Sequence, residues 1–146
     1  MNPAMSYLIF INGTNPDDVK FFRSLHARFE KKKIKLKIFA FVDSKVEIQD
    51  FGMALYTRSG ISWNNLPKKK LIELVKSREF DVLFHLNPEE LPHLHFLAVA
   101  AKANFKISTL TELPNNFSLT VKSKSSLSLG EKFEEMNTVL ENLTIK

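Results

Sequence analysis

Short apolar runs and amphipathic stretches alternate along the chain. Ser6–Gly13 (SYLIFING) and Asp81–Leu86 (DVLFHL) are almost entirely apolar on both alternating faces, which predicts strands buried on both sides of a sheet. Lys33–Ser44 (KIKLKIFAFVDS) alternates lysine with aliphatic residues and then becomes continuously apolar, which predicts a strand that runs from solvent into the core. Asp17–Lys33 and Lys68–Arg78 carry apolar residues at helical spacing.

The rest of the chain repeats this alternation. A looser stretch, Lys45 to Pro67, contains FGMALYT as a candidate third strand. A helix that starts at Pro92 and includes HFLAVAAKANF is followed by the short strand FKIST, and FSLTV is a candidate last strand. Gly130 to Leu143 predicts a closing amphipathic helix.

Strands that alternate with helices predict right-handed crossover connections and a mainly parallel sheet covered on both faces. We therefore predict an α/β fold, a three-layer α/β/α Rossmann-like domain with about five strands, in which Ser6–Asn12 and Asp81–Leu86 are central and adjacent. The 146 residues have the length of one domain and show no internal repeat or low-complexity linker, so residues 1–146 are expected to form a single domain.

Composition narrows the classes of function. The absence of cysteine excludes disulfides, thiolate metal sites and a cysteine nucleophile. No apolar run approaches the roughly 20 residues of a membrane-spanning helix. The start, MNPAMSYLIF, lacks the basic flank and cleavage site of a secretory signal, so we expect a cytoplasmic protein with no membrane partner. No G-x-S-x-G motif is present, and the sequence identifies no catalytic residue.

The net charge of +5 comes with clustered lysines, and a basic surface attracts phosphate backbones whatever their sequence. The candidate polyanion-binding residues are Lys31, Lys32, Lys33, Lys68, Lys69 and Lys70. The first three are also explained without a ligand, since cations are favoured at the C-terminal end of a helix. Because no aromatic-plus-basic RNA-binding signature or helix-turn-helix pattern accompanies the lysines, nucleic acid is an unfavoured partner.

Three of the four histidines gather between residues 80 and 108, together with two glutamates. His93 and His95 are two residues apart and point to nearly opposite sides of a helix, so they lack the i, i+4 spacing of a metal-binding pair. His85 lies in a strand between apolar residues, where we expect a hydrogen-bonded histidine. No metal site is predicted.

Two similar tetrapeptides, Asn15-Pro16-Asp17-Asp18 and Asn87-Pro88-Glu89-Glu90, each follow a strand. In both, asparagine can cap a helix, proline needs no N–H group in the first turn, and the acids complement the helix dipole. Pro92 follows so closely on the second tetrapeptide that we predict a short turn there and a helix that begins at Pro92. The two glutamates are therefore expected to have a structural role.

The carboxyl ends of the strands are the expected ligand site of such a fold. The candidate ligand-binding residues are Asn12, Gly13, Thr14, Asp43 and Asn87. Asp43 follows the second predicted strand, which is where dinucleotide-binding domains carry the acid that binds the ribose. However, the loop has one glycine where G-x-G-x-x-G needs three, and the first-turn acids Asp17 and Asp18 would repel a pyrophosphate. No cofactor is predicted.

The chain resembles a family of short bacterial proteins of unknown function over roughly Leu8 to Leu143. The resemblance rests on four features: FAFVDSK, the isolated Trp63 with Pro67, FDVLFHLN and LHFLAVAAKANFKIS. The strand–helix–strand pattern is also similar to the N-terminal, acceptor-side domain of heptosyltransferase-like GT-B glycosyltransferases. Ser108-Thr109 stands where those enzymes often have glycine, and their sugar-nucleotide-binding domain has no counterpart in this sequence. The resemblance implies a fold and leaves the activity open.

Two hypotheses from different classes follow. The first is a non-catalytic Rossmann-like module that binds a small ligand, a protein partner or a second copy of itself at the strand ends. The second is a weak nucleic-acid or polyanion binder that uses the lysine clusters, and a remnant of a glycosyltransferase acceptor domain is third. Lysine clusters on one continuous face would favour the second hypothesis, and separated clusters would favour the first. An enzyme would need converging polar side chains, which the sequence alone does not assemble.

Overall fold

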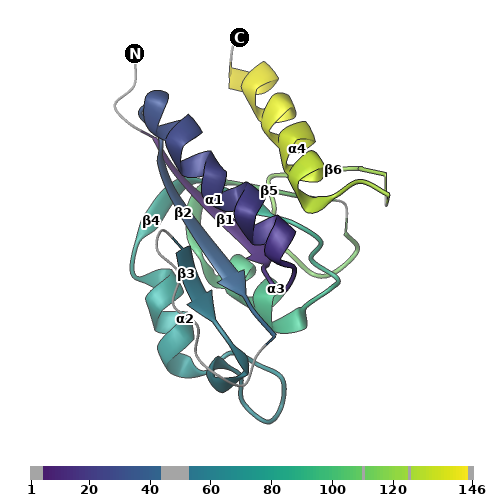
Figure 1. The fold of residues 1–146 in the computed structure, drawn as a ribbon. Coiled ribbons are helices and arrows are strands. Elements are labelled where there is room, and N and C mark those ends of the chain that lie inside the picture. The colour runs from purple at the N-terminus through teal and green to yellow at the C-terminus, as the bar shows by residue number, and fades with distance from the viewer. Residues whose placement is uncertain (1–4, 44–52, 110, 125, 145–146) are drawn as a thin grey trace.

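The computed structural model describes residues 5–43, 53–109, 111–124 and 126–144, and within them six strands form one sheet. The elements, in chain order, are β1 (Ser6–Asn12), α1 (Pro16–Lys31), β2 (Lys35–Phe41), β3 (Met53–Tyr56), the 3-10 turn η1 (Arg58–Gly60), α2 (Lys69–Lys76), β4 (Glu79–His85), α3 (Pro92–Ala100), β5 (Lys102–Thr109), β6 (Leu119–Val121) and α4 (Leu129–Thr144). Figure 1 shows the strands running side by side with helices around them.

The strand order is β3-β2-β1-β4-β5-β6, and every neighbouring pair is parallel. This is the strand order of the dinucleotide-binding Rossmann fold. The predictions of an α/β/α domain and of central, adjacent β1 and β4 are confirmed. The sheet has six strands, since both candidate strands, FGMALYT and FSLTV, contribute a short edge strand.

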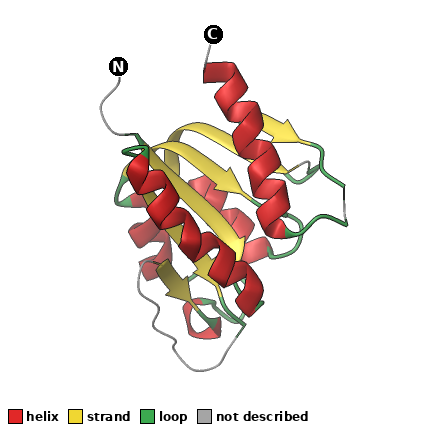
Figure 2. Cartoon of the chain, turned by 45° about the horizontal axis from the view of Figure 1, so that its top comes forward, coloured by secondary structure: helices red, strands yellow, loops and turns green. Residues whose placement is uncertain are grey.

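Two apolar clusters occupy the two faces of the sheet. On one face, Phe22, Leu25 and Phe29 of α1 and Phe133 of α4 pack against alternate residues of the central strands, such as Ile9. Figure 2 shows α1 and α4 on the same side of the sheet.

On the other face, Val75 of α2 and Leu94 and Leu97 of α3 pack against the remaining strand residues, such as Phe10 and Phe39. Burial on both faces explains why the central strands read as continuous apolar runs.

The two ends of α1 follow local rules. Asn15 caps its N-terminus, because the Asn15 Oδ1 accepts a hydrogen bond from the Asp17 N–H at 2.9 Å. At its C-terminus Lys33 has φ 59°, and the N–H groups of Lys33 and Ile34 donate to the carbonyls of Glu30 and Phe29. This is a Schellman turn with lysine at the left-handed position that glycine usually takes.

The boundary between α3 and β5 differs from the prediction. The stretch HFLAVAAKANF was expected to be helical throughout, but α3 ends at Ala100 and β5 begins at Lys102. Lys102 and Ala103 pair with Glu79 and Phe80 of β4, so sheet pairing overrides the helix propensity of alanine and lysine.

Candidate functional site

The carboxyl ends of the parallel strands bring several predicted residues to one edge of the sheet. Asn12 ends β1, and Asp43 and Asn87 lie two residues beyond β2 and β4. The Thr14 hydroxyl accepts a hydrogen bond from the main-chain N–H of Asp43 at 3.0 Å, which ties the β1–α1 turn to the end of β2. The structure therefore joins Asn12, Thr14 and Asp43 in one region.

Gly13 is required by close packing in this turn. A Cβ atom at Gly13 would lie 3.1 Å from the Cβ of Ala40 and 3.3 Å from a methyl group of Val19. Its N–H donates to the carbonyl of Phe41 at 2.7 Å, so this N–H is already used within the sheet. The glycine lets α1 start close to β2, and its main chain offers no free donor to a phosphate.

Asp43 is engaged by a neighbouring cation. Its Oδ1 accepts a hydrogen bond from the Arg58 Nε at 2.5 Å, with both side chains about half exposed. This hydrogen bond from Arg58 lowers the pKa of the Asp43 carboxyl below its usual value. A ribose hydroxyl would have to compete with the guanidinium for the same carboxylate.

Carboxylates gather at the N-terminus of α1, where a phosphate would otherwise be favoured. Partial burial raises the pKa of Asp18, and the nearby charges of Asp17 and Glu90 raise it further. A dinucleotide would bring more negative charge to a position where three carboxylates already repel one another.

Glu90 lies at the strand ends for a reason that the sequence reasoning missed. The short turn after β4 and the start of α3 at Pro92 are as predicted, with Leu91 as the cap residue. The Asn12 Nδ2 donates to the Glu90 Oε1 at 2.9 Å. This bond joins the loops after β1 and β4, the two strands between which the chain direction switches, and no local pattern signals it.

Asn87 is held in a specific conformation beside this bond. Its φ of 53° is in the left-handed region, its N–H donates to the Thr109 hydroxyl at 2.9 Å, and its Oδ1 accepts from the Lys132 Nζ at 3.0 Å. Asparagine tolerates the left-handed region better than most residues do. Asn87 therefore connects β4, β5 and α4.

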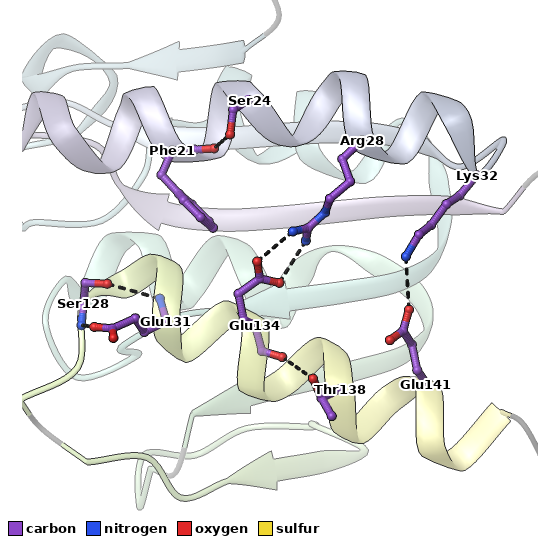
Figure 3. Close-up of polar contacts among 9 residues, drawn as sticks. All are labelled: Phe21, Ser24, Arg28, Lys32, Ser128, Glu131, Glu134, Thr138 and Glu141. Carbon is purple, nitrogen blue, oxygen red and sulfur yellow. Dashed lines mark hydrogen bonds and ion pairs between the residues drawn. The ribbon is translucent and has the colours of Figure 1, made fainter.

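The position of Lys132 depends on how α4 begins. The Ser128 N–H donates to Glu131 Oε1 at 2.9 Å, and the Glu131 N–H donates to Ser128 Oγ at 3.2 Å, as Figure 3 shows. This S-x-x-E capping box is a local pattern that the sequence itself contains, from Ser128 to Glu131. It fixes the first turn of α4, and Lys132 follows directly.

Two ion pairs then hold α4 against α1. Arg28 donates from both terminal nitrogens to the Glu134 carboxylate, at 2.7 and 2.9 Å, and Lys32 lies 3.3 Å from Glu141 (Figure 3). A two-bond guanidinium–carboxylate contact fixes direction as well as distance. The α4 helix therefore presents Lys132 to Asn87 from a constrained position.

A hollow of about 540 Å³ opens at this place, and we call it the carboxyl-edge pocket. Its volume lies within the range of about 300–1,000 Å³ that is usual for small-molecule sites. Its lining consists of Asn87, Pro88, Glu89, Glu90, Thr109, Lys122, Ser123 and Lys132. Of the predicted ligand-binding residues, Asn87 lines this pocket, and Asn12 is linked to it through Glu90.

The two lysine clusters lie far from each other in the fold. Lys31–Lys33 end α1 and precede β2, so they lie at the amino ends of the strands. Lys68–Lys70 begin α2 after β3, at the carboxyl ends and on the opposite face of the sheet. The clusters do not form one continuous patch, which is the arrangement that favours the first hypothesis.

Three of the four histidines, His85, His93 and His95, are buried on the α2/α3 face. His93 Nδ1 lies 2.8 Å from the Tyr56 hydroxyl, and His95 Nε2 lies 2.7 Å from the Pro114 carbonyl. His93 and His95 therefore contact different neighbours, as their spacing predicts. Within the described ranges, no three His, Cys, Asp or Glu side chains are grouped so that they could hold a metal ion.

His85 differs from expectation. It is fully buried and stacks on His95 with ring centroids 5.5 Å apart, but neither ring nitrogen has a hydrogen-bond partner among the described residues. The expected hydrogen bond is not made with normal geometry, and the rings of Phe10 and Phe117 lie beside the imidazole. Burial, followed by the charge of His95, lowers the pKa of His85 to about 3.

Comparison with known proteins identifies a family but no activity. Residues 1–143 match the model of a family described as a family of unknown function, DUF6913. The chain belongs to this family. The DUF6913 match confirms the resemblance to a family of unknown function. No curated protein and no solved structure matches the chain. No helix among the described parts of this DUF6913 chain has both the length and the apolar character needed to cross a membrane.

Proposed function

We propose that the domain is a non-catalytic binding module that takes a small polar ligand with one anionic group in the carboxyl-edge pocket. The observation that carries this proposal is the pair of lysines, Lys122 and Lys132, in a pocket whose floor is fixed by Asn87. The ammonium of Lys132 is held by a neutral amide oxygen, and no carboxylate of the described residues is within ion-pair distance of it. An anion can therefore approach it without displacing a salt bridge.

The acidic residues of the pocket lining indicate which groups the rest of the ligand carries. Glu89 and Glu90 bring carboxylates, and Glu90 already accepts one hydrogen bond from Asn12. Carboxylates accept hydrogen bonds, so they suit hydroxyl or ammonium groups. The chemical class that fits both walls is a small hydroxylated or amino-bearing acid or phosphate monoester.

Catalysis is not part of the proposal. Two hydroxyl side chains line the pocket: Ser123 donates a hydrogen bond to Glu135 at 2.7 Å, and Thr109 accepts one from the Asn87 N–H at 2.9 Å. The nearby imidazoles of His85, His93 and His95 are buried. The proposal therefore lacks the base and orienting partner that an activated nucleophile needs.

The finer parts of the resemblance belong to this proposal as well. The strand–helix–strand pattern resembles an acceptor-side domain of the heptosyltransferase type, and such a domain would bind its ligand at the same carboxyl ends of the strands. A bacterial, cytoplasmic protein remains the prediction from the sequence. The polyanion hypothesis is less well supported, because the two lysine clusters lie at opposite ends of the strands, Lys31–Lys33 at the amino ends and Lys68–Lys70 at the carboxyl ends.

The test is thermal unfolding of the full chain with a panel of hydroxy acids, amino acids and sugar phosphates. A member at 100 times its dissociation constant would stabilise the fold by about 2.7 kcal/mol, which is easily detected at this size. Lys132→Met should abolish the shift, and Lys20→Met, on the exposed side of α1, should retain it. NAD should give no shift. A panel without any stabilising member, or a shift that Lys132→Met leaves intact, would reject the proposal.

A further inference from the structure

The turn between η1 and α2 presents a tryptophan to solvent. An antiparallel bridge joins Ile61 to Pro67, and the Ser62 N–H donates to the Leu66 carbonyl at 2.8 Å, so the backbone of the turn is fixed. Trp63, at its tip, is 97% exposed. A side chain with that exposure contributes almost no apolar burial to the fold, so its position needs another explanation.

Trp63 lies in a stretch of the chain that exposes other large apolar side chains. Leu66 is 41% exposed and Leu74 53%, so one short stretch supplies three of the five large apolar side chains that are exposed among the described residues. Scattered single residues of this kind are ordinary, but a group of them marks an interaction site.

A cleft lies directly beside the turn. Leu55 of β3 and Leu71 and Leu74 of α2 line it, and its volume is about 820 Å³. Gly60 and Lys68, which flank the turn and are joined by a 2.9 Å main-chain hydrogen bond, lie at the edge of this cleft. The turn that carries Trp63 therefore borders the cleft, and we call the turn and the cleft together the tryptophan surface.

The charge of the tryptophan surface is mainly positive. Lys68, Lys69 and Lys70 are all exposed where α2 begins, and Glu73 is the one acidic residue in the lining of the cleft. Complementary charge directs association and rejects partners of the same sign. A partner must therefore combine an apolar face with acidic residues.

We propose that the tryptophan surface binds an acidic amphipathic helix of a partner protein. Apolar side chains of that helix fill the cleft, its acidic residues face Lys68–Lys70, and Trp63 packs over it as an interface anchor. A bilayer surface cannot enter a cleft. Single-stranded nucleic acid is usually bound by several aromatic side chains, whereas the tryptophan surface exposes one, Trp63, and the other exposed aromatic side chain among the described residues, Phe96, is on α3. The surface lies on the α2 face, away from the carboxyl-edge pocket beside α4, so this proposal does not depend on the proposed function.

The experiment uses the full chain, in which Trp63 is the only tryptophan. Two tryptophan-free synthetic helical peptides carry leucine at the same i, i+3, i+4, i+7 positions, one with glutamate and one with lysine on the remaining face. Titration of each peptide is followed by the emission of Trp63. We expect the acidic peptide to shift this emission to shorter wavelength, saturably, and to bind at least tenfold more tightly than the basic one.

Variants locate the binding. Leu74→Ser should weaken the acidic peptide at least tenfold, and Leu143→Ser, which changes a similarly exposed leucine on α4, should leave its affinity unchanged. The proposal is overturned if the acidic peptide gives no saturable shift, if both peptides bind equally, or if Leu74→Ser has no effect. A shift produced only by phosphatidylglycerol vesicles or by oligothymidylate would replace the protein partner by a membrane or a nucleic acid.

Discussion

Replacing His85 by leucine is expected to protect the fold against acid. The wild-type ring is completely buried at the end of β4, stacked on His95, with both nitrogens unpaired among the described residues. Leucine has a similar volume and no polar atom, so His85→Leu removes the ionisable group and leaves little cavity.

The magnitude follows from the pKa of the imidazole. Burial lowers the pKa of His85 to about 3 in the folded protein, whereas an unfolded histidine titrates near 6.5. Between pH 6.5 and pH 3 the unfolded state binds a proton at His85 that the folded state does not bind. The contribution of neutral His85 to the free energy of unfolding is therefore fully present above pH 6.5 and is lost as the pH falls from 6.5 towards 3. Between pH 7.5 and pH 5 the loss due to His85 is about 2 kcal/mol. Burial also lowers the pKa of His93. Protonation of His93 therefore destabilises the wild type and the His85→Leu variant alike and does not account for a difference between them.

The measurement is urea unfolding at pH 7.5 and pH 5. Wild type should lose about 2 kcal/mol more than His85→Leu between the two pH values. At pH 7.5 the variant should equal wild type or exceed it by about 1 kcal/mol, since it no longer buries unpaired nitrogens. As a control, Phe84→Leu shortens the neighbouring core residue and should lower stability equally at both pH values. Identical pH dependence in His85→Leu and wild type would show that the folded protein stabilises the protonated ring, and our reasoning would then be wrong.

Two further predictions concern α1. Lys33→Gly should stabilise the fold by about 1 kcal/mol in urea unfolding, because glycine takes the left-handed conformation at φ 59° without steric cost. Lower stability would show that the lysine side chain contributes more than its backbone costs. A double-mutant cycle of Arg28→Ala and Glu134→Ala should give a coupling of about 0.5–1 kcal/mol that falls in 1 M salt, because both side chains are about 40% exposed. Coupling that salt leaves unchanged would contradict the ionic origin of the contact.

The sequence predicts the fold well because the decisive signals are local. The apolar runs of β1 and β4 could only be strands buried on both faces, and Asn15-Pro16 marks the start of α1 with a cap that the structure contains. The end of α3 was missed because alanine and lysine favour a helix until β4 offers Lys102 a sheet partner. That information lies in the tertiary structure.

The candidate site was less predictable, because its contacts join distant segments. Asn12 and Glu90 are 78 residues apart and Asn87 and Lys132 are 45 apart, and no periodicity links either pair. Asparagine and glycine at the strand ends led us to the carboxyl ends of the strands, where we propose the ligand site. The pocket itself depends on where α4 places Lys132. The capping box at Ser128 sets the first turn of that helix, but the packing of α4 against α1, which orients the whole helix, is not readable from the sequence.

The central position of β1 has a consequence for the protein during its synthesis. This strand leaves the ribosome before the other described elements, but β4, which pairs with its second edge, follows roughly seventy residues later, or about 4–15 s at typical translation rates. The α4 helix, which packs on the same apolar cluster, comes last of all. The nascent chain therefore carries an apolar strand with an open edge for several seconds, and it is during this interval that chaperones would protect it from aggregation.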